Sequence, residues 1–195
     1  MADTRSRMVD AAISALQRHG VAGMSFTDVL QDSGAARGAI YHHFPGGKTQ
    51  LIAEAAARNG DEVRAALATL PAADPVTVVT AFLDAIRPVL AASTTGSGCA
   101  VAAITVGASE PGSGDTDLRR TAADIFASWG QILAERLESP GLPPAEAGEL
   151  ATTLIMLLEG AHVLCRAAGD LEPFERAART AVALTRTRYG TRPDA

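Results

Sequence analysis

The stretch Ser25–Lys48, SFTDVLQDSGAARGAIYHHFPGGK, decides the fold because it carries start and stop signals for two helices. Ser25 is followed three residues later by Asp28, which is the pattern of an N-terminal capping box. Gly34 can adopt the left-handed conformation in which many helices end. Pro45–Gly47 stops whatever helix precedes it. The stretch therefore predicts a helix, a tight turn and a second short helix.

The second helix, expected over residues 37–44, has two different faces. Ile40 and Phe44 lie four residues apart, so both can pack on the preceding helix. The other face presents a guanidinium, a phenol, an imidazole and a position without a side chain: Arg37, Tyr41, His42 and Gly38. These groups suit guanine edges, phosphates and a close backbone approach. Such a surface is typical of a helix that reads the major groove of DNA.

Lys48 is the only lysine in the chain, and it lies at the start of a longer helix expected to reach Leu70. Backbone N–H groups at a helix N-terminus also favour a phosphate, although a solvated lysine is the alternative. Arg5 and Arg7 are equally compatible with phosphate contacts and with solvated side chains. The candidate DNA-binding residues are Ser25, Thr27, Arg37, Gly38, Ala39, Tyr41, His42, His43 and Lys48.

The segment RGAIYHHF-PGGK, residues 37–48, resembles the helix-turn-helix of TetR-family transcriptional regulators. GCAVAAI at 98–104 and LEGAHVLCRAAGDLEPFERAA at 158–178 further resemble the LmrA/YxaF-like branch of that family. The resemblance implies a three-helix DNA-binding domain over residues 1–47 and a ligand-binding and dimerisation domain over residues 48–195. It also implies a homodimer that binds a palindromic operator in double-stranded DNA and is released by a small effector.

One position departs from the family pattern. The residue before Arg37 is commonly a serine or threonine that caps the recognition helix and touches phosphate, whereas this chain has Ala36. Loss of an N-cap costs about 1 kcal/mol of helix stability. Thr27 or the backbone must therefore make the phosphate contact.

Composition favours an all-α fold of about nine helices. The 195 residues are 47% hydrophobic, with many alanines, and only 4% aromatic. The net charge of −5 argues against a general affinity for nucleic acid. Residues 1–60 hold six basic against five acidic side chains, a charge of +1, so DNA affinity has to come from a local patch.

Beyond residue 70 the pattern predicts five more helices, over 76–92, 99–108, 115–138, 145–168 and 172–189. Pro88 is expected to bend or end the first of them. The last two should form a hairpin, and residues 150–164 are apolar nearly all round that helix. A two-fold partner would cover such a helix, which independently indicates a homodimer.

An effector pocket is expected among the helices that follow the linker. Its candidate lining residues are Phe82, Ile86, Cys99, Phe126, Trp129, Met156, Glu159 and His162. This mostly apolar set suits an aromatic or otherwise hydrophobic compound. The alternative is a filled core in which Phe82, Ile86, Phe126 and Met156 only pack, with His162 as a satisfied core histidine.

Other classes of function lack a signature. His42 and His43 are adjacent and cannot both face one ion on a helix, so no metal or other cofactor is expected. The sequence contains no nucleophile motif and no phosphate-binding loop, which argues against an enzyme. The first ten residues have no apolar core, and charged residues interrupt the most apolar run. Together with Cys99 and Cys165 lying far apart, this indicates a cytoplasmic protein that does not enter a membrane.

Three functions remain open at this point. The first is a repressor released by a small hydrophobic ligand. The second is a structural DNA-binding or protein-interaction dimer without an effector, or a transcriptional activator. The third is an enzyme that uses the same helical fold, which ligand binding without turnover would dismiss.

Overall fold

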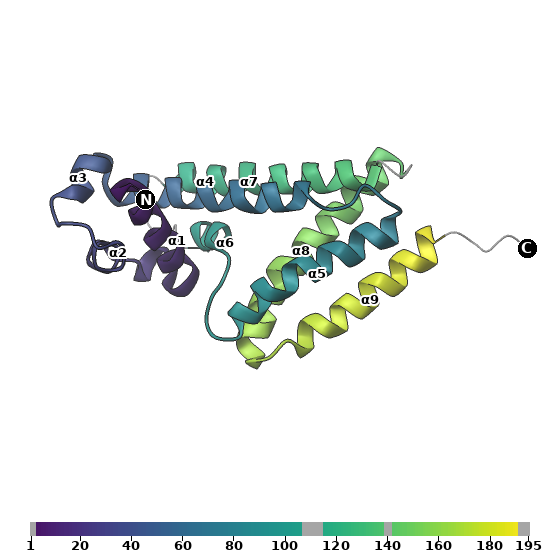
Figure 1. Cartoon of the computed structure of the whole chain (residues 1–195). Helices are drawn as coiled ribbons and strands as arrows, with labels where there is room; N and C mark the ends of the chain where they lie inside the picture. The colour runs from purple at the N-terminus through teal and green to yellow at the C-terminus, as the bar shows by residue number, and fades with distance from the viewer. Residues whose placement is uncertain (1–2, 107–114, 139–141, 191–195) are drawn as a thin grey trace, which may run out of the picture. The chain divides into compact units, whose positions relative to one another are not determined.

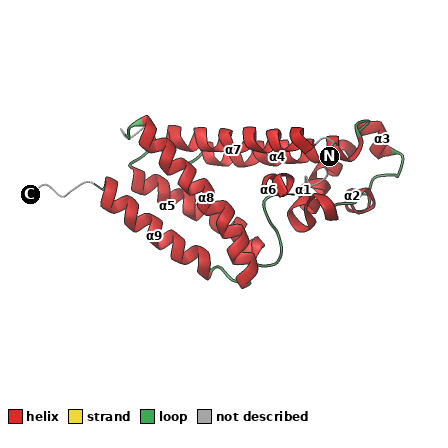
Figure 2. Ribbon diagram, turned by 180° about the vertical axis from the view of Figure 1, so that it is seen from behind, coloured by secondary structure: helices red, strands yellow, loops and turns green. Residues whose placement is uncertain are grey.

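The structure is a computed structural model that describes residues 3–106, 115–138 and 142–190. Every regular element in these ranges is an α-helix (Figure 2), which confirms the all-α prediction. The described ranges contain nine helices, labelled in Figure 1: α1 Thr4–Gly23, α2 Phe26–Ser33, α3 Ala39–His43, α4 Gly47–Ala68, α5 Pro75–Ser93, α6 Ala100–Val106, α7 Asp115–Glu138, α8 Pro144–Ala168 and α9 Glu172–Tyr189.

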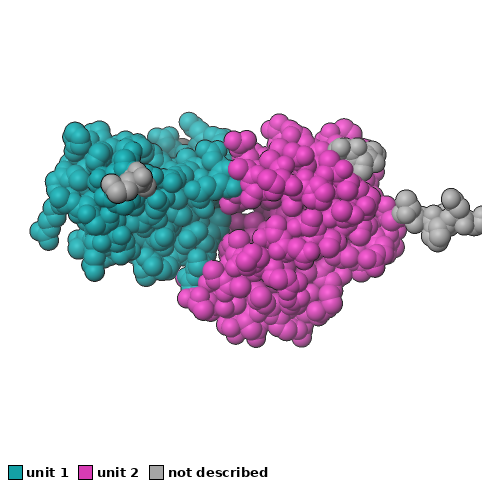
Figure 3. All heavy atoms as spheres, viewed as in Figure 1, with its two compact units in different colours: residues 1–62, 96–125 teal, residues 63–95, 126–195 magenta. Residues whose placement is uncertain are grey.

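The chain divides into two compact units, which Figure 3 colours separately. Unit 1 comprises residues 1–62 and 96–125, and unit 2 comprises residues 63–95 and 126–195. The predicted domain boundary after residue 47 stays a prediction. A feature that the sequence did not reveal is that α6 belongs to unit 1, where the Gly98 N–H donates to the Gln17 carbonyl at the end of α1 at 2.8 Å.

The core of unit 1 is built on α1, whose apolar stripe includes the buried residues Met8 and Leu16. Gly20 has φ of +66°, which is outside the helical range, so α1 is kinked there. The helices α4 and α7 approach closely at Gly60, where a Cβ atom would lie 2.6 Å from Ile125 Cγ2. Glycine at this position therefore allows the two helices to pack.

The core of unit 2 contains the buried side chains of Phe82, Trp129 and Phe174, from α5, α7 and α9. The carboxylate of Asp74 caps α5 by accepting from the N–H groups of Val76 and Thr77. Two helices, α5 and α8, are long and apolar enough by composition to cross a membrane. Because both pack on each other and on α9, this composition is that of core helices in a helical bundle.

Several predicted helix ends differ from the structure by one or two residues. The recognition helix begins at Ala39 instead of Arg37, because no side chain caps it and Gly38 occupies the N-cap position. Pro88, which was expected to bend or end α5, does not end it, since α5 continues to Ser93, one residue past the predicted end. The helix expected over 99–108 begins at Ala100, and its last two residues lie outside the described ranges.

Candidate functional site

The two short helices of unit 1 form by local capping chemistry. Ser25 Oγ accepts from the Asp28 N–H at 3.1 Å, which fixes the start of α2. Gly34 adopts φ of +65°, and the Ala35 N–H donates to the Leu30 carbonyl at 3.1 Å, which closes the end of the helix. Thr27 lies exposed in the first turn. The predicted helix and turn are therefore present.

The helix α3 separates its two faces as the sequence predicts. Ile40 and Phe44 are buried, whereas the Tyr41 side chain is 68% exposed. The Tyr41 ring meets the Phe26 ring edge-on, with centroids 6.1 Å apart, so the phenol is held from one side. His42 and His43 stack edge-on at 5.0 Å, His42 being exposed and His43 half-buried. This face presents polar aromatic groups to solvent.

Four of the six basic residues in the first 60 positions bind groups of unit 1 itself. Arg5 pairs with Glu54, Arg7 Nε donates to the Ser33 carbonyl at 3.0 Å, Arg18 pairs with Asp32 at 3.1 Å, and Arg58 pairs with Asp10 at 3.1 Å. These partners account for Arg5 and Arg7, for which the sequence left two alternatives open. The four side chains hold α1 to α2 and to α4.

Arg37 and Lys48, the other two basic residues in the first 60 positions, differ from these four arginines in their surroundings. Among the residues that the structure describes, neither has an acidic side chain within ion-pair distance. Arg37 is exposed in the turn before α3, and Lys48 is half-buried in the first turn of α4. A guanidinium and an ammonium that precede and follow an exposed aromatic helix along the chain are groups that bind phosphates and base edges.

The candidate effector residues of unit 2 fall into two groups. Phe82, Ile86 and Trp129 are buried in the core. Phe126 and Met156 instead line an open groove of about 430 Å³ between α7 and α8, whose walls are otherwise mostly small residues. Met156 is 71% exposed. It is therefore not a core residue, which was the alternative that its helical spacing left open. Of the predicted set, Phe126 and Met156 thus share this groove.

His162 is buried on α8, and its Nδ1 lies 2.7 Å from Ser93 Oγ on α5. Burial, assisted by the positive charge of Arg166, lowers the pKa of His162 to about 4. The imidazole is therefore neutral at physiological pH. Among the alternatives left open, this is the environment of a satisfied core histidine.

The remaining two candidates are Cys99 and Glu159. Cys99 belongs to unit 1, where its sulfur accepts from the Ala102 N–H at 3.3 Å at the start of α6. Glu159 is half-buried on α8. No group of three His, Cys, Asp or Glu side chains that could hold a metal ion occurs in the described ranges.

Two family models match the chain. Residues 8–55 match the model of bacterial regulatory proteins of the tetR family, and residues 75–180 match that of the C-terminal domain of LmrA/YxaF-like transcriptional regulators. The chain belongs to the TetR family. Both the helix-turn-helix and the hairpin of α8 and α9 lie largely within the matched residues.

Relatives of this TetR-family chain share nearly its whole length. The HTH-type transcriptional regulator Rv0196 of Mycobacterium tuberculosis is 36% identical over 181 residues, with 90% of each chain covered. The HTH-type transcriptional regulator LmrA of Bacillus subtilis is 28% identical over 173 residues, covering 88% of this chain and 90% of LmrA. Both relatives are named as HTH-type transcriptional regulators.

Solved structures share the fold of the TetR-family chain. A TetR transcriptional regulator from Legionella pneumophila superposes with a TM-score of 0.79 at 24% identity, over 95% of this chain and 98% of that one. A cysteine mutant of the TetR-family regulator CifR, solved with 26-base-pair operator DNA, gives a TM-score of 0.69 at 20% identity, over 93% and 96% of the two chains. The predicted family and fold are therefore confirmed.

Some residues of the TetR-family DNA-binding unit were missed by reasoning from the sequence. Gln50 and Glu54 of α4 hydrogen-bond to each other, and Glu54 also holds Arg5. The four-residue spacing of Gln50 and Glu54 on a helix is the only sequence signal for this arrangement. The partner Arg5 lies 49 positions away, so no local pattern identifies it.

Proposed function

We propose that this chain is a sequence-specific, dimeric transcriptional repressor that leaves a palindromic operator when a small hydrophobic ligand binds. The observation that supports it best is the division of the basic side chains in unit 1. Four arginines are bound within the unit, whereas Arg37 and Lys48 flank the exposed face of α3. The complex of CifR with operator DNA supports the same type of partner.

In this proposal each DNA-binding side chain has a distinct role. Arg37 donates to the edge of a guanine, Tyr41 and His42 contact bases or phosphates, and Lys48 binds a phosphate. Gly38 and Ala39 allow the start of α3 to approach the groove closely, because neither has a large side chain. Ser25 and Thr27 support the same surface through the cap and the first turn of α2, and His43 supports it by stacking edge-on against His42.

Replacing Arg37 by alanine is expected to relax base preference at one position of each half-site, at a cost of about 1–3 kcal/mol. The cause is the loss of a bidentate contact to one base. Arg37→Lys keeps the charge without the fork of donors and should lose nearly as much discrimination. Binding to a panel of single-base operator variants measures the effect. Unchanged base preference in Arg37→Ala would reassign Arg37 to phosphate.

Replacing Lys48 by alanine is expected to weaken binding to all DNA sequences alike. One phosphate contact fewer releases one counterion fewer, so the slope of log affinity against log salt should become shallower by about one. Titrations at several salt concentrations measure this slope. Arg176→Ala removes a charge from α9 and is the matched control. A slope that stays at the wild-type value in Lys48→Ala contradicts the assignment.

A dimer is needed because two recognition helices must enter successive major grooves about 34 Å apart. The exposed apolar residues of α8 and α9 support a partner on that hairpin. In this proposal the effector domain begins at residue 48, so that α4, Gly47–Ala68, leads from the DNA-binding domain into it. A ligand that prefers one orientation of α4 would shift the operator affinity.

For the effector, the groove lined by Phe126 and Met156 suits a hydrophobic compound. The buried Phe82 and Trp129 instead favour the second candidate, a dimer whose core is filled and which needs no effector. We assign the protein to the cytoplasm, where its DNA partner is. We assign it no catalytic role.

The test has two stages. Selection of bound DNA from a random pool should yield a two-fold symmetric consensus, and hydrophobic compounds should then release the protein from it. A symmetric site with no releasing compound favours the dimer without an effector. Increased transcription from that site would indicate an activator, and no consensus at all would refute the proposal.

A further inference from the structure

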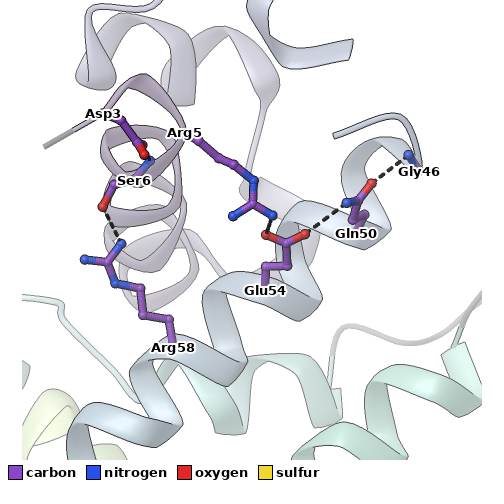
Figure 4. Close-up of polar contacts among 7 residues, drawn as sticks. All are labelled: Asp3, Arg5, Ser6, Gly46, Gln50, Glu54 and Arg58. Atoms are coloured by element: carbon purple, nitrogen blue, oxygen red, sulfur yellow. Dashed lines mark hydrogen bonds and ion pairs between the residues drawn. The ribbon is translucent and has the colours of Figure 1, made fainter. Parts of the chain in front are cut away.

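A chain of polar contacts joins the start of α1 to the turn after α3, as Figure 4 shows. Arg5 of α1 pairs with one carboxylate oxygen of Glu54 on α4. The other carboxylate oxygen accepts from Gln50 Nε2 at 2.9 Å. The amide oxygen of Gln50 in turn accepts from the Gly46 N–H at 2.7 Å. We call Arg5, Gln50 and Glu54 the α4 clamp.

The same guanidinium also touches the end of the recognition helix. The Arg5 Cζ atom lies 5.2 Å from the centroid of the Phe44 ring, within the range of a cation–π contact. Phe44 is fully buried, and its N–H donates to the Ile40 carbonyl at 2.7 Å, so it closes α3. Arg5 therefore contacts both the residue that caps the end of α3 and the second turn of α4.

Such support matters because α3 has little stability of its own. It has five residues and no side-chain cap at its start, and an isolated helix of that length is unstable in water. The turn that follows contains Gly46 and Gly47, which are the residues with the most backbone freedom. Without outside contacts, the exposed face of α3 and Lys48 would have no fixed relative position.

We propose that Arg5, Gln50 and Glu54 are positioning residues for DNA recognition, which hold α3 and Lys48 in register without touching DNA themselves. This inference rests on the proposed function. It explains the presence of a carboxylate, Glu54, in a unit that binds a polyanion. A carboxylate that does no positioning only repels phosphates, so the two roles predict opposite effects when its charge is removed.

Glu54→Ala is therefore the decisive variant. We expect its operator affinity to fall about tenfold, because ordering even one backbone residue costs about that much. The salt slope should stay at the wild-type value, since no phosphate contact is lost. Glu62→Ala is the matched control, because Glu62 lies two turns further along α4 and contacts Arg58 at 3.5 Å. Unchanged or tighter operator binding by Glu54→Ala overturns the proposal.

Arg5→Ala separates positioning from direct contact. A positioning role predicts weaker operator binding with an unchanged salt slope, whereas a phosphate contact predicts a slope shallower by about one. The double variant with Glu54→Ala should bind about as well as the weaker single variant, because both remove the same clamp. A shallower slope in Arg5→Ala, or fully additive losses in the double variant, contradicts the inference.

Amide hydrogen exchange of Gly46 tests the clamp without DNA. Exchange should become faster in Gln50→Ala, which removes the acceptor, and also in Glu54→Ala, which frees Gln50. Unchanged Gly46 exchange in both variants overturns the clamp even if operator binding is intact. The converse result is that the wild-type protein selects no operator while Gly46 exchange becomes faster in both variants. That result refutes the proposed function alone and leaves the clamp in place.

Discussion

Replacing Leu184 by glutamate is expected to split the dimer and to weaken operator binding by about 10²–10⁴-fold. Leu184 is 65% exposed on α9, and Leu164 of the neighbouring α8 is 58% exposed. With Met156 and Val163, they leave the hairpin with four large apolar side chains open to water. A buried, unpaired carboxylate in that interface would be far costlier than the apolar contact it replaces.

The loss is large because dimerisation makes the second half-site an intramolecular partner. Sedimentation gives the oligomeric state, and titration of a palindromic site gives the affinity. Ala91→Glu adds the same charge to an exposed position of α5, on the side opposite its buried residues, and is the control. If Leu184→Glu remains a dimer while a glutamate at Leu164 does not, the interface uses α8 alone. If both remain dimeric, the two-fold partner lies elsewhere.

Acidification is expected to destabilise the protein through His162 by about 3 kcal/mol. The pKa of His162 is lowered from 6.5 to about 4 by burial, so the unfolded chain binds more protons between these values. The contribution of the neutral imidazole is therefore complete above pH 6.5 and is lost as the pH falls from 6.5 towards 4. Below pH 4 both states are protonated, and the slope due to His162 vanishes.

Denaturant unfolding at a series of pH values measures this dependence. His162→Gln should flatten the curve between pH 4 and 6.5, because glutamine does not titrate in that range. His19→Gln makes the same change at an exposed position of α1 and controls for the loss of a histidine as such. A His162→Gln protein with the full wild-type slope would show that other groups cause the acid sensitivity.

The DNA-binding unit shows where reasoning from the sequence succeeds. The start of α2 at Ser25 and its end at Gly34 depend on hydrogen bonds between residues three to five positions apart, so the residue types alone identify them. The start of α3 was set two residues too early, because Ala36 offers no cap and the backbone instead forms a turn through Gly38. Local chemistry thus located the helices to within about one turn.

Two residues of the candidate effector set show where reasoning from the sequence fails. Helical spacing places apolar residues on one face, but it does not reveal what covers that face. Phe82 is buried and Met156 is 71% exposed, although both lie on apolar stripes of core-forming helices. Their difference depends on which neighbouring helix packs against each stripe.

By itself, the sequence determined the helical fold, the caps of the recognition motif and the exposed face of α3, because each follows from residues within a few positions of one another. The tertiary structure decided which basic side chains remain available. Arg5 reaches Glu54 across 49 positions and Arg7 reaches Ser33 across 26, whereas Arg37 and Lys48 have no such partner among the described residues. Pairing between distant residues depends on how helices pack, and no local pattern of residues carries that information.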